Sequence, residues 1–268
     1  MKKILAAAIG AGALVVLGGV APANAADAPA KLSVLHGVPG LTVDVYVNNE
    51  LKLDDFKPGD LAGPLELPAG TYTVAITASD AADASAPAIG PVDLPLESGR
   101  DYTAVAHLTE AGEPALTPFV NDTTGVPAGE ARVTVRHVAA APGVDVRAGG
   151  QVVVDGLTNP NEESLTVPAG TVSADVVLAG TDTVAIGPAD LMLAEGATTV
   201  VYAWGSQEAG YELAVQTISG AHSAPSGVPG GSAGLVDEGG LPLPVAAVSL
   251  AGLVAAGVAV RRLAGSRA

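Results

Sequence analysis

Residues 31–120 of this chain are repeated, with changes, as residues 131–218. The closest match lies between Ala88–Gly99 and Ala185–Gly196, which are identical at eight of twelve positions. The offset between the copies falls from 101 to 97, and each change lies in a polar stretch where a loop can absorb insertions and deletions. Other matched segments are Leu32–His36 with Val133–His137, Val43–Val45 with Val144–Val146, and Leu65–Thr71 with Leu165–Thr171. The repeat therefore predicts two tandem domains of one fold.

Each copy has the hydrophobic pattern of β-strands. Short runs of alternating apolar and polar residues are separated by Gly, Pro, Asn or Asp at intervals of about eight to twelve residues, which is typical of an all-β sandwich or barrel. We therefore expect an all-β protein with two tandem β-sandwich domains of immunoglobulin or transthyretin type. In the first copy the expected strands cover residues 32–36, 43–48, 50–53, 64–67, 71–77, 88–94, 102–108 and 115–120.

Two turns recur at equivalent places in the copies. Asn48-Asn49 lies between the second and third expected strands, and Gly149-Gly150 takes the same place in the second copy. Both residue types tolerate positive φ, so the pair predicts a tight hairpin. Pro68-Ala-Gly70 and Pro168-Ala-Gly170 also predict turns, because Pro fixes φ and Gly is free to adopt a left-handed conformation.

Three motifs of the first copy follow one another in a characteristic order: Val34-Leu-His36 with Pro39, Val43-Asp-Val-Tyr46, and Leu67-Pro-Ala-Gly-Thr-Tyr72. In these residues the chain resembles the bacterial domain-of-unknown-function family 4397, whose members have a V-x-H-x-x-P-like strand, a V-D-V-Y strand and an L-P-A-G-T-Y turn and strand. The second copy has Arg147 and Val172 where the aromatic residues would stand, so it resembles a degenerate copy. The resemblance implies an exported, β-rich surface module, and it assigns no catalytic or binding residue.

The first 25 residues have the pattern of an export signal. Lys2 and Lys3 precede an apolar run, and Ala23-Asn-Ala25 has the small-x-small pattern of a cleavage site. We expect residues 1–25 to be a signal peptide and the mature chain to begin near Ala26. An uncleaved membrane anchor is the alternative.

A second apolar segment, residues 241–260, carries no charge over twenty residues. At about 1.5 Å per residue, a helix of this length spans roughly 30 Å of hydrocarbon, so we expect a transmembrane helix rather than a buried core helix. Acidic residues precede the segment and arginines follow it, which predicts that residues 261–268 form a cytoplasmic basic tail. The Gly/Pro/Ser-rich residues 222–240 predict a flexible linker before the helix.

The charge of the chain is concentrated between its two ends. All 28 acidic residues lie between Asp27 and Glu238, together with only seven of the twelve basic residues, so this part carries a net charge of −21. Such a charge repels nucleic acid, which we therefore exclude as a partner. The chain has no cysteine, so no disulfide framework, Cys-based metal site or cysteine nucleophile is expected.

His36 and His137 occupy equivalent positions and are the first candidates for chemistry. Strand parity places His36 on the same face as Leu32 and Val34, so each histidine is expected at the edge of a core with a hydrogen bond to a nearby backbone group. Asp44 and Asp145 alternate with valines and are expected to face the other way, so a His–Asp pair does not follow from the spacing. A ligand or metal at the histidines is the alternative.

Two other groups are candidates for binding. The acidic segments Asp54-Asp55 to Asp60 and Asp80 to Asp83 could supply oxygen ligands to calcium, but their spacing fits no calcium-loop signature. The second copy has Asp155, Asn159, Asn161, Glu162 and Glu163 instead of the first segment. Trp204 and Tyr202, with Tyr211, could form an aromatic platform for a sugar, although a single Trp on a strand is more often a core residue.

These features predict no catalytic residue, no cofactor and no metal site, so we do not expect an enzyme. The segment Leu241-Pro-Leu-Pro-Val245 resembles a Gram-positive wall-sorting signal but has Pro244 and Val245 where Thr and Gly are needed, so we expect retention by the membrane span. We expect a single-pass protein of a Gram-positive, actinobacterial cell membrane, with an extracellular part of structural or adhesive function. The expected partners are the membrane and a cell-wall polymer or surface protein. A glycan-binding module is the alternative, and a surface hydrolase is a more distant one.

Overall fold

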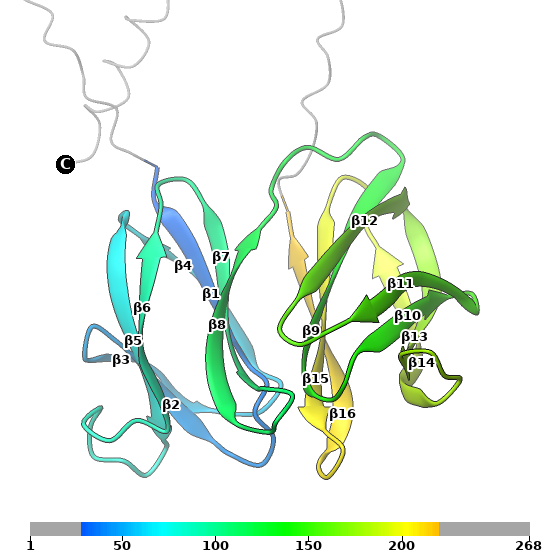
Figure 1. Cartoon of the computed structure of the whole chain (residues 1–268). Helices are drawn as coiled ribbons and strands as arrows, with labels where there is room; N and C mark the ends of the chain where they lie inside the picture. The colour runs from blue at the N-terminus through cyan, green and yellow to red at the C-terminus, as the bar shows by residue number, and fades with distance from the viewer. Residues whose placement is uncertain (1–27, 220–268) are drawn as a thin grey trace, which may run out of the picture. The chain divides into compact units, whose positions relative to one another are not determined.

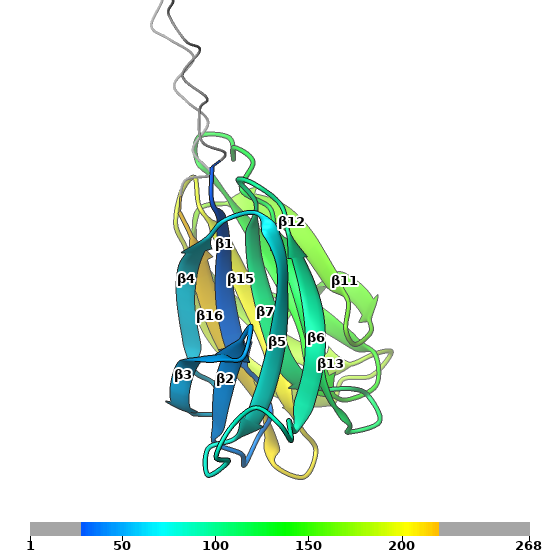
Figure 2. The same cartoon turned by 90° about the vertical axis from the view of Figure 1, so that its left-hand side faces the viewer.

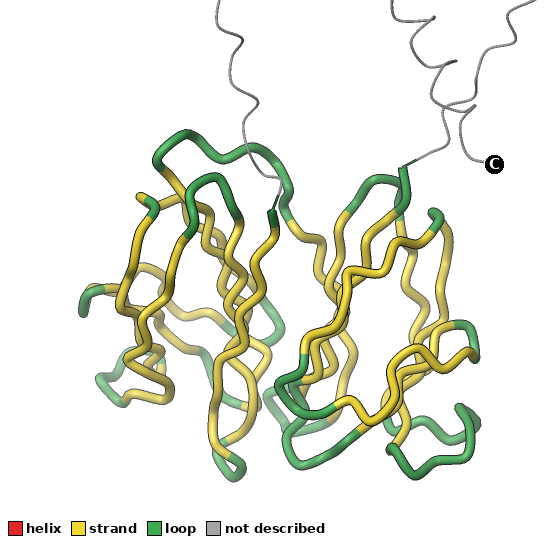
Figure 3. Tube along the Cα trace, turned by 180° about the vertical axis from the view of Figure 1, so that it is seen from behind, coloured by secondary structure: helices red, strands yellow, loops and turns green. Residues whose placement is uncertain are grey.

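The computed structural model describes residues 28–219 of the chain. Every regular element in this range is a β-strand, and loops join the strands (Figure 3). Among residues 28–219 there is no helix with the length and apolar character needed to cross a membrane. The expected signal peptide (residues 1–25), linker (222–240), transmembrane helix (241–260) and basic tail (261–268) lie outside the described residues.

The first sandwich consists of two four-stranded sheets that face each other (Figure 1). Its strands are β1 (Ala30–His36), β2 (Val43–Val47), β3 (Glu50–Phe56), β4 (Leu61–Leu67), β5 (Gly70–Ala78), β6 (Ile89–Leu96), β7 (Asp101–Leu108) and β8 (Pro114–Asn121). One sheet has the order β4-β1-β7-β8 and the other β3-β2-β5-β6. Strands β1 and β7 are parallel, whereas the other neighbours are antiparallel.

The second sandwich repeats this topology strand for strand. Its strands are β9 (Glu130–Ala140), β10 (Val144–Ala148), β11 (Gln151–Leu157), β12 (Glu162–Pro168), β13 (Gly170–Leu178), β14 (Val184–Leu193), β15 (Thr198–Ser206) and β16 (Gly210–Ile218). The sheet orders are β12-β9-β15-β16 and β11-β10-β13-β14, and β9 and β15 form the parallel pair. The expected all-β architecture with two sandwich-like units is confirmed.

The turn chemistry of the repeat explains its hairpins. Asn48 and Asn49 have φ values of 52° and 63°, and Gly149 and Gly150 have 56° and 80°, so two residue types meet the same backbone requirement between equivalent strands. The second predicted turn differs between copies. Gly170 has a φ of 140°, whereas Gly70 does not have a positive φ, and in the first copy the Tyr72 hydroxyl donates a hydrogen bond to the Pro68 carbonyl across the turn.

The inner faces of each sandwich form a hydrophobic core, and the two cores differ in their largest residues. The first core contains buried aromatic side chains, Phe56 and Tyr102, among aliphatic residues. The second core is a smaller cluster of valines and one leucine: Val135, Val144, Val146, Val154, Leu157 and Val176.

The second copy also replaces the cross-strand pair Tyr46 and Ala75 by Arg147 and Asp175, which form a bidentate ion pair of 2.7 and 2.8 Å.

The two sandwiches bury a third apolar cluster between them. Successive residues of a strand point to opposite faces, so Val34 lies in the first core while Leu35 points to the outer face of the same sheet. There Leu35, Val105 and Phe119 of the first sandwich pack with residues of the second sandwich, which are Val138, Val200, Tyr202, Trp204 and Ile218. Sheet β4-β1-β7-β8 therefore has apolar residues on both faces, as expected for a sheet that is covered on both sides.

Two glycines of the first sandwich make room for Trp204. A Cβ at Gly37 would lie 3.3 Å from the Cβ of Trp204 and 3.2 Å from the Ala106 carbonyl oxygen. A Cβ at Gly59 would lie 3.2 Å from Cζ2 of the indole, and Gly59 has a φ of 85°. The indole of Trp204 therefore lies against backbone, and its side chain is only 4% exposed.

We expect Gly37→Ala to destabilise the protein by about 1 to 3 kcal/mol, because the new methyl group overpacks the contact with Trp204. Gly70→Ala is the matched control, since its new methyl group would lie 3.8 Å from the nearest atom and the site has no positive φ. Residues 26–219 contain all sixteen strands and every core residue named above, so urea denaturation of this fragment measures the effect. Equal stability of the two variants would contradict the packing described.

Candidate functional site

His36 and His137 both use a ring nitrogen to hold a loop. Nε2 of His36 lies 2.6 Å from the Leu41 carbonyl oxygen, and Nε2 of His137 lies 3.0 Å from the Pro142 carbonyl oxygen. A carbonyl only accepts, so both nitrogens donate. His36 also stacks on Phe56, with ring centroids 6.1 Å apart. Both side chains are fully buried, His36 at the last residue of β1 and His137 within β9, and each ties the loop after its strand to the core, on the face that strand parity predicted.

Burial keeps these histidines neutral. It lowers the pKa of His36 and of His137 below the usual value, against the opposing effect of the carbonyl partners. It also lowers the pKa of His107, whose Nδ1 donates to the Leu108 carbonyl oxygen and whose Nε2 accepts from the Thr117 hydroxyl. Because the unfolded chain binds protons more readily at these groups, they reduce stability as the pH falls below about 6.5.

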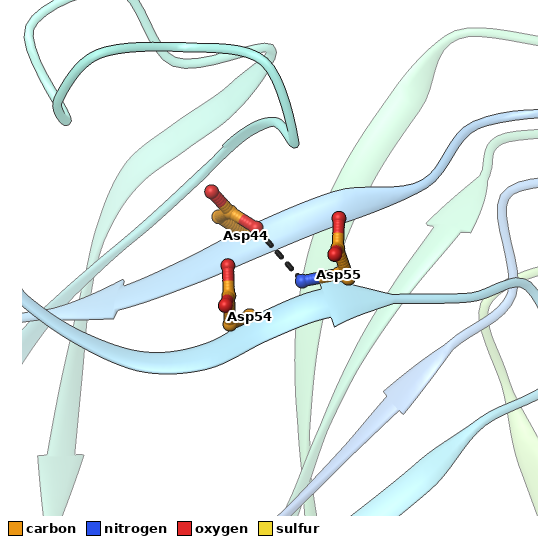
Figure 4. A group of neighbouring side chains, drawn as sticks. All are labelled: Asp44, Asp54 and Asp55. Atoms are coloured by element: carbon orange, nitrogen blue, oxygen red, sulfur yellow. Dashed lines mark hydrogen bonds between the residues drawn. The ribbon is translucent and has the colours of Figure 1, made fainter.

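Three carboxylates gather where β2 and β3 pair in the first sandwich (Figure 4). Asp44, Asp54 and Asp55 each offer an oxygen within 4.8 Å of the others, and they are the side chains in the described range that could hold a hard cation. Asp44 is buried, and its Oδ1 accepts a hydrogen bond of 2.9 Å from the Asp55 amide. That bond holds Asp55 at a φ of 51°, so Asp44 has a structural use without an ion.

The second sandwich keeps the structural use of the buried aspartate and loses the carboxylate cluster. Asp145 accepts hydrogen bonds from the amides of Gly156 and Gly180, at 2.7 and 2.9 Å. These bonds lower the pKa of the Asp145 carboxyl below its usual value. Gly156, with a φ of 62°, takes the place of Asp55. The shared role of this aspartate is therefore to stabilise a left-handed residue in the neighbouring strand.

The other acidic residues of the predicted calcium segments do not join this cluster. Asp60 accepts a hydrogen bond of 3.0 Å from the Lys57 amide, and Asp83 accepts one of 2.9 Å from the Ser85 amide. The cluster that the described residues form pairs Asp54 and Asp55 with Asp44 instead. The sequence pattern did not indicate that Asp44 joins Asp54 and Asp55, because Asp44 lies between two core valines in its strand.

Two of the three aromatic residues that could have formed a sugar platform are buried, and the third, Tyr211, is half-buried. Tyr202 is 0% exposed and Trp204 is 4% exposed, and both lie in the cluster between the sandwiches. The hydroxyl of Tyr211 donates to the Ala140 carbonyl, at 3.2 Å. Trp204 is thus a buried residue, as expected, but its neighbours belong to both sandwiches rather than to one core.

A chain of buried polar groups crosses between the sandwiches. Arg136 is 1% exposed, and its guanidinium donates to Glu162 at 2.6 Å and to the Tyr202 hydroxyl at 2.8 Å. The Tyr202 hydroxyl donates to the Gln216 side-chain oxygen, which also accepts from the Thr103 hydroxyl of the first sandwich. Burial raises the pKa of the Tyr202 hydroxyl, so it remains a donor.

The chain of polar groups continues within the first sandwich. The Asn121 amide nitrogen donates to the Thr103 hydroxyl at 3.0 Å and to the Asp101 carboxylate at 2.6 Å. Phe119 lies beneath the guanidinium of Arg136, with 4.4 Å from Cζ to the ring centroid. The hydrogen bond from Thr103 to Gln216 therefore joins the buried polar groups of the two sandwiches into one network.

Sequence reasoning missed this network. Arg132, Thr134 and Arg136 alternate with core residues in β9, which is the ordinary pattern of a strand with one face in water. The available signal was in the first copy, where Leu35, Val105 and Phe119 are apolar on the face opposite to the core. That signal indicates a covered face without identifying what covers it.

Residues 30–147 match the family described as Domain of unknown function (DUF4397). The match supports one domain of this family at residues 30–147, so the resemblance noted in the sequence is confirmed for the first copy. The match covers β1 to β8, the connection to the second sandwich, and β9 and β10. No curated protein matches the chain.

We expect His36→Ala to lower the stability of the first sandwich by about 1 to 3 kcal/mol, because it leaves the Leu41 carbonyl without its donor and a cavity beside Phe56. Thermal denaturation with EDTA, zinc or calcium is expected to leave the melting temperatures of wild type and variant unchanged. A metal-dependent shift in the wild type that disappears in His36→Ala would make the histidine a ligand instead.

We expect Glu162→Gln to cost about 1 to 3 kcal/mol, because it leaves the buried guanidinium of Arg136 without its partly exposed anionic partner. The double variant Arg136→Met/Glu162→Gln should regain most of this loss, since it removes the buried charge itself. The adjacent, exposed Glu163→Gln is the control and should stay within about 0.5 kcal/mol of wild type. Chemical denaturation measures all three, and equal losses for Glu162→Gln and Glu163→Gln would refute a stabilising ion pair between Arg136 and Glu162.

Proposed function

We propose that this protein is a non-catalytic, membrane-anchored cell-surface protein that displays two sandwiches as one rigid block, with a structural or adhesive role. The N-terminal signal pattern, the uncharged segment 241–260 and the arginines after it support export and anchoring. The acidic charge of the intervening part suits exposure at a surface. The observation that carries the proposal is the buried contact between the sandwiches, which makes two modules one unit.

The second sandwich is, in this proposal, a diverged copy of the same DUF4397 module. Its sheet orders match those of the first sandwich strand for strand, including the single parallel pair. The division into four plus four strands differs from the four plus three of an immunoglobulin constant domain, and so favours the transthyretin type among the two expected types.

A non-catalytic role is supported by how the reactive side chains are used. The three buried histidines hold loops or strands through backbone carbonyls, and the indole of Trp204 fills the contact between the sandwiches. The same burial of Tyr202 and Trp204 removes the aromatic platform on which the glycan-binding alternative depended.

The path of the chain favours display of one set of loops. Strand β1 begins and strand β16 ends at the same end of the sandwiches (Figures 1 and 2). The hydrogen bond from Thr198 to the Asp122 carbonyl ties the two sandwiches there, and Thr198 pairs with Ile218 at the end of β16. The loops 79–88, 109–113 and 179–183 lie toward the opposite end of the sandwiches from these two chain ends, and they are the segments proposed for display (Figure 1).

Protease treatment of intact cells tests the proposal. We expect the membrane fraction to hold a chain that begins near Ala26, and external protease to release a resistant fragment that contains residues 28–219. The fragment resists because its strands and the contact between the sandwiches are buried. A full-length chain in the soluble cytoplasmic fraction, protected from external protease, would refute the topology.

A further inference from the structure

The second sandwich contains an apolar cavity between its two sheets. The cavity has a volume of about 160 Å³, and all of its lining side chains are aliphatic. They come from both sheets and include Val133, Leu165, Val146, Val172, Ala174 and Leu191. An apolar cavity of about 150 Å³ in a protein core stays dry and accepts a molecule the size of benzene.

The cavity results from smaller residues at positions that the first sandwich fills. Tyr72 pairs with Leu94 in the first sandwich, whereas Val172 pairs with the equivalent Leu191 in the second. Val74, which pairs with Val92, corresponds to Ala174, which pairs with Ala189. Since the surrounding strands keep the same order and pairing, the lost side-chain volume is not recovered by collapse of the sheets.

A third replacement leaves an unpaired polar atom next to the cavity. Tyr102 of the first sandwich pairs with Leu32, and its hydroxyl accepts a hydrogen bond of 3.1 Å from the Glu97 amide. The equivalent residue is Thr199, which pairs with the cavity-lining Val133 and is 2% exposed. Its hydroxyl has no hydrogen-bond partner. This hydroxyl therefore lies unpaired on the core face, next to a strand that lines the cavity.

The approach to the cavity is acidic. A depression of about 410 Å³ adjoins the cavity at Val153 and lies along β11 and the start of β12. Asp155 and Glu163 add negative charge to its lining, whereas the charge of Glu162 is compensated by its ion pair with Arg136. This charge disfavours a ligand with an anionic head group.

We propose that the cavity of the second sandwich binds a short aliphatic chain that carries a neutral polar head, such as an alcohol. The chain lies among the valines and leucines between the sheets, where it removes apolar surface from water. The carboxylates at the approach favour a neutral head group over an anionic one. The first sandwich lacks this site because Tyr72 and Tyr102 occupy the corresponding volume.

Methyl NMR of residues 26–219 with 1-hexanol and hexanoate as probes tests the proposal. We expect 1-hexanol to shift the methyl signals of Val172 and Leu191 saturably while those of the buried Val74 in the first sandwich stay unchanged. Hexanoate is expected to bind at least about tenfold more weakly, because the carboxylates repel it. No saturable shift at Val172 and Leu191, or shifts spread equally over both sandwiches, would overturn the proposal, and equal binding of hexanoate would overturn the choice of head group.

Exchanging residues between the copies provides matched variants. Val172→Tyr should abolish the shifts at Leu191, because it restores the residue that fills the first sandwich, where the Tyr72 hydroxyl reaches the Pro68 carbonyl. Ala174→Val adds less side-chain volume to the cavity and should weaken hexanol binding. It replaces Val172→Tyr as the test if that variant does not fold. Tyr72→Val should create hexanol-dependent shifts at Leu94. Unchanged binding in both filled variants would overturn the assignment of the site.

Discussion

The structure depends on the burial of one sheet face of each sandwich against the other. Trp204 lies against Gly37 and Gly59, and Phe119 lies beneath Arg136, so large side chains of one sandwich meet backbone or a ring of the other. Each face alone would expose several large apolar residues to water. The contact therefore makes the two copies mutually dependent, although each has its own core.

The polar network within this contact gives it a defined register. Gln216 accepts hydrogen bonds from Tyr202 of its own sandwich and from Thr103 of the other, so a shift of one sheet past the other would leave buried donors unpaired.

The cores of the two copies differ, although both copies take part in this contact. The first copy keeps an aromatic core, while the second has an ion pair at Arg147 and Asp175 and a cavity at Val172. The second sandwich is thus free to acquire a ligand while the first retains the better-packed core.

Much of the fold could be predicted from the sequence, because local chemistry determines it. The Asn48-Asn49 and Gly149-Gly150 turns and the alternating valines are enough to define hairpins and two sandwich-like units. The arrangement of the candidate sites could not be predicted in the same way. Asp44 meets Asp54 and Asp55 because the register of β2 and β3 shifts between Val43 and Val45, which alternation alone does not reveal. The partners of Arg136 and Trp204 come from tertiary contacts, so the sequence shows only that a strand is apolar on both faces.

Calorimetric unfolding of residues 26–219 tests most directly whether the two sandwiches form one unit. We expect a single transition with equal calorimetric and van't Hoff enthalpies, because loss of either sandwich exposes the contact on the other. We also expect Trp204→Ala to separate this transition into two, since the largest side chain of the contact is removed. Two independent transitions in the wild-type protein, unchanged by Trp204→Ala, would contradict the central claim.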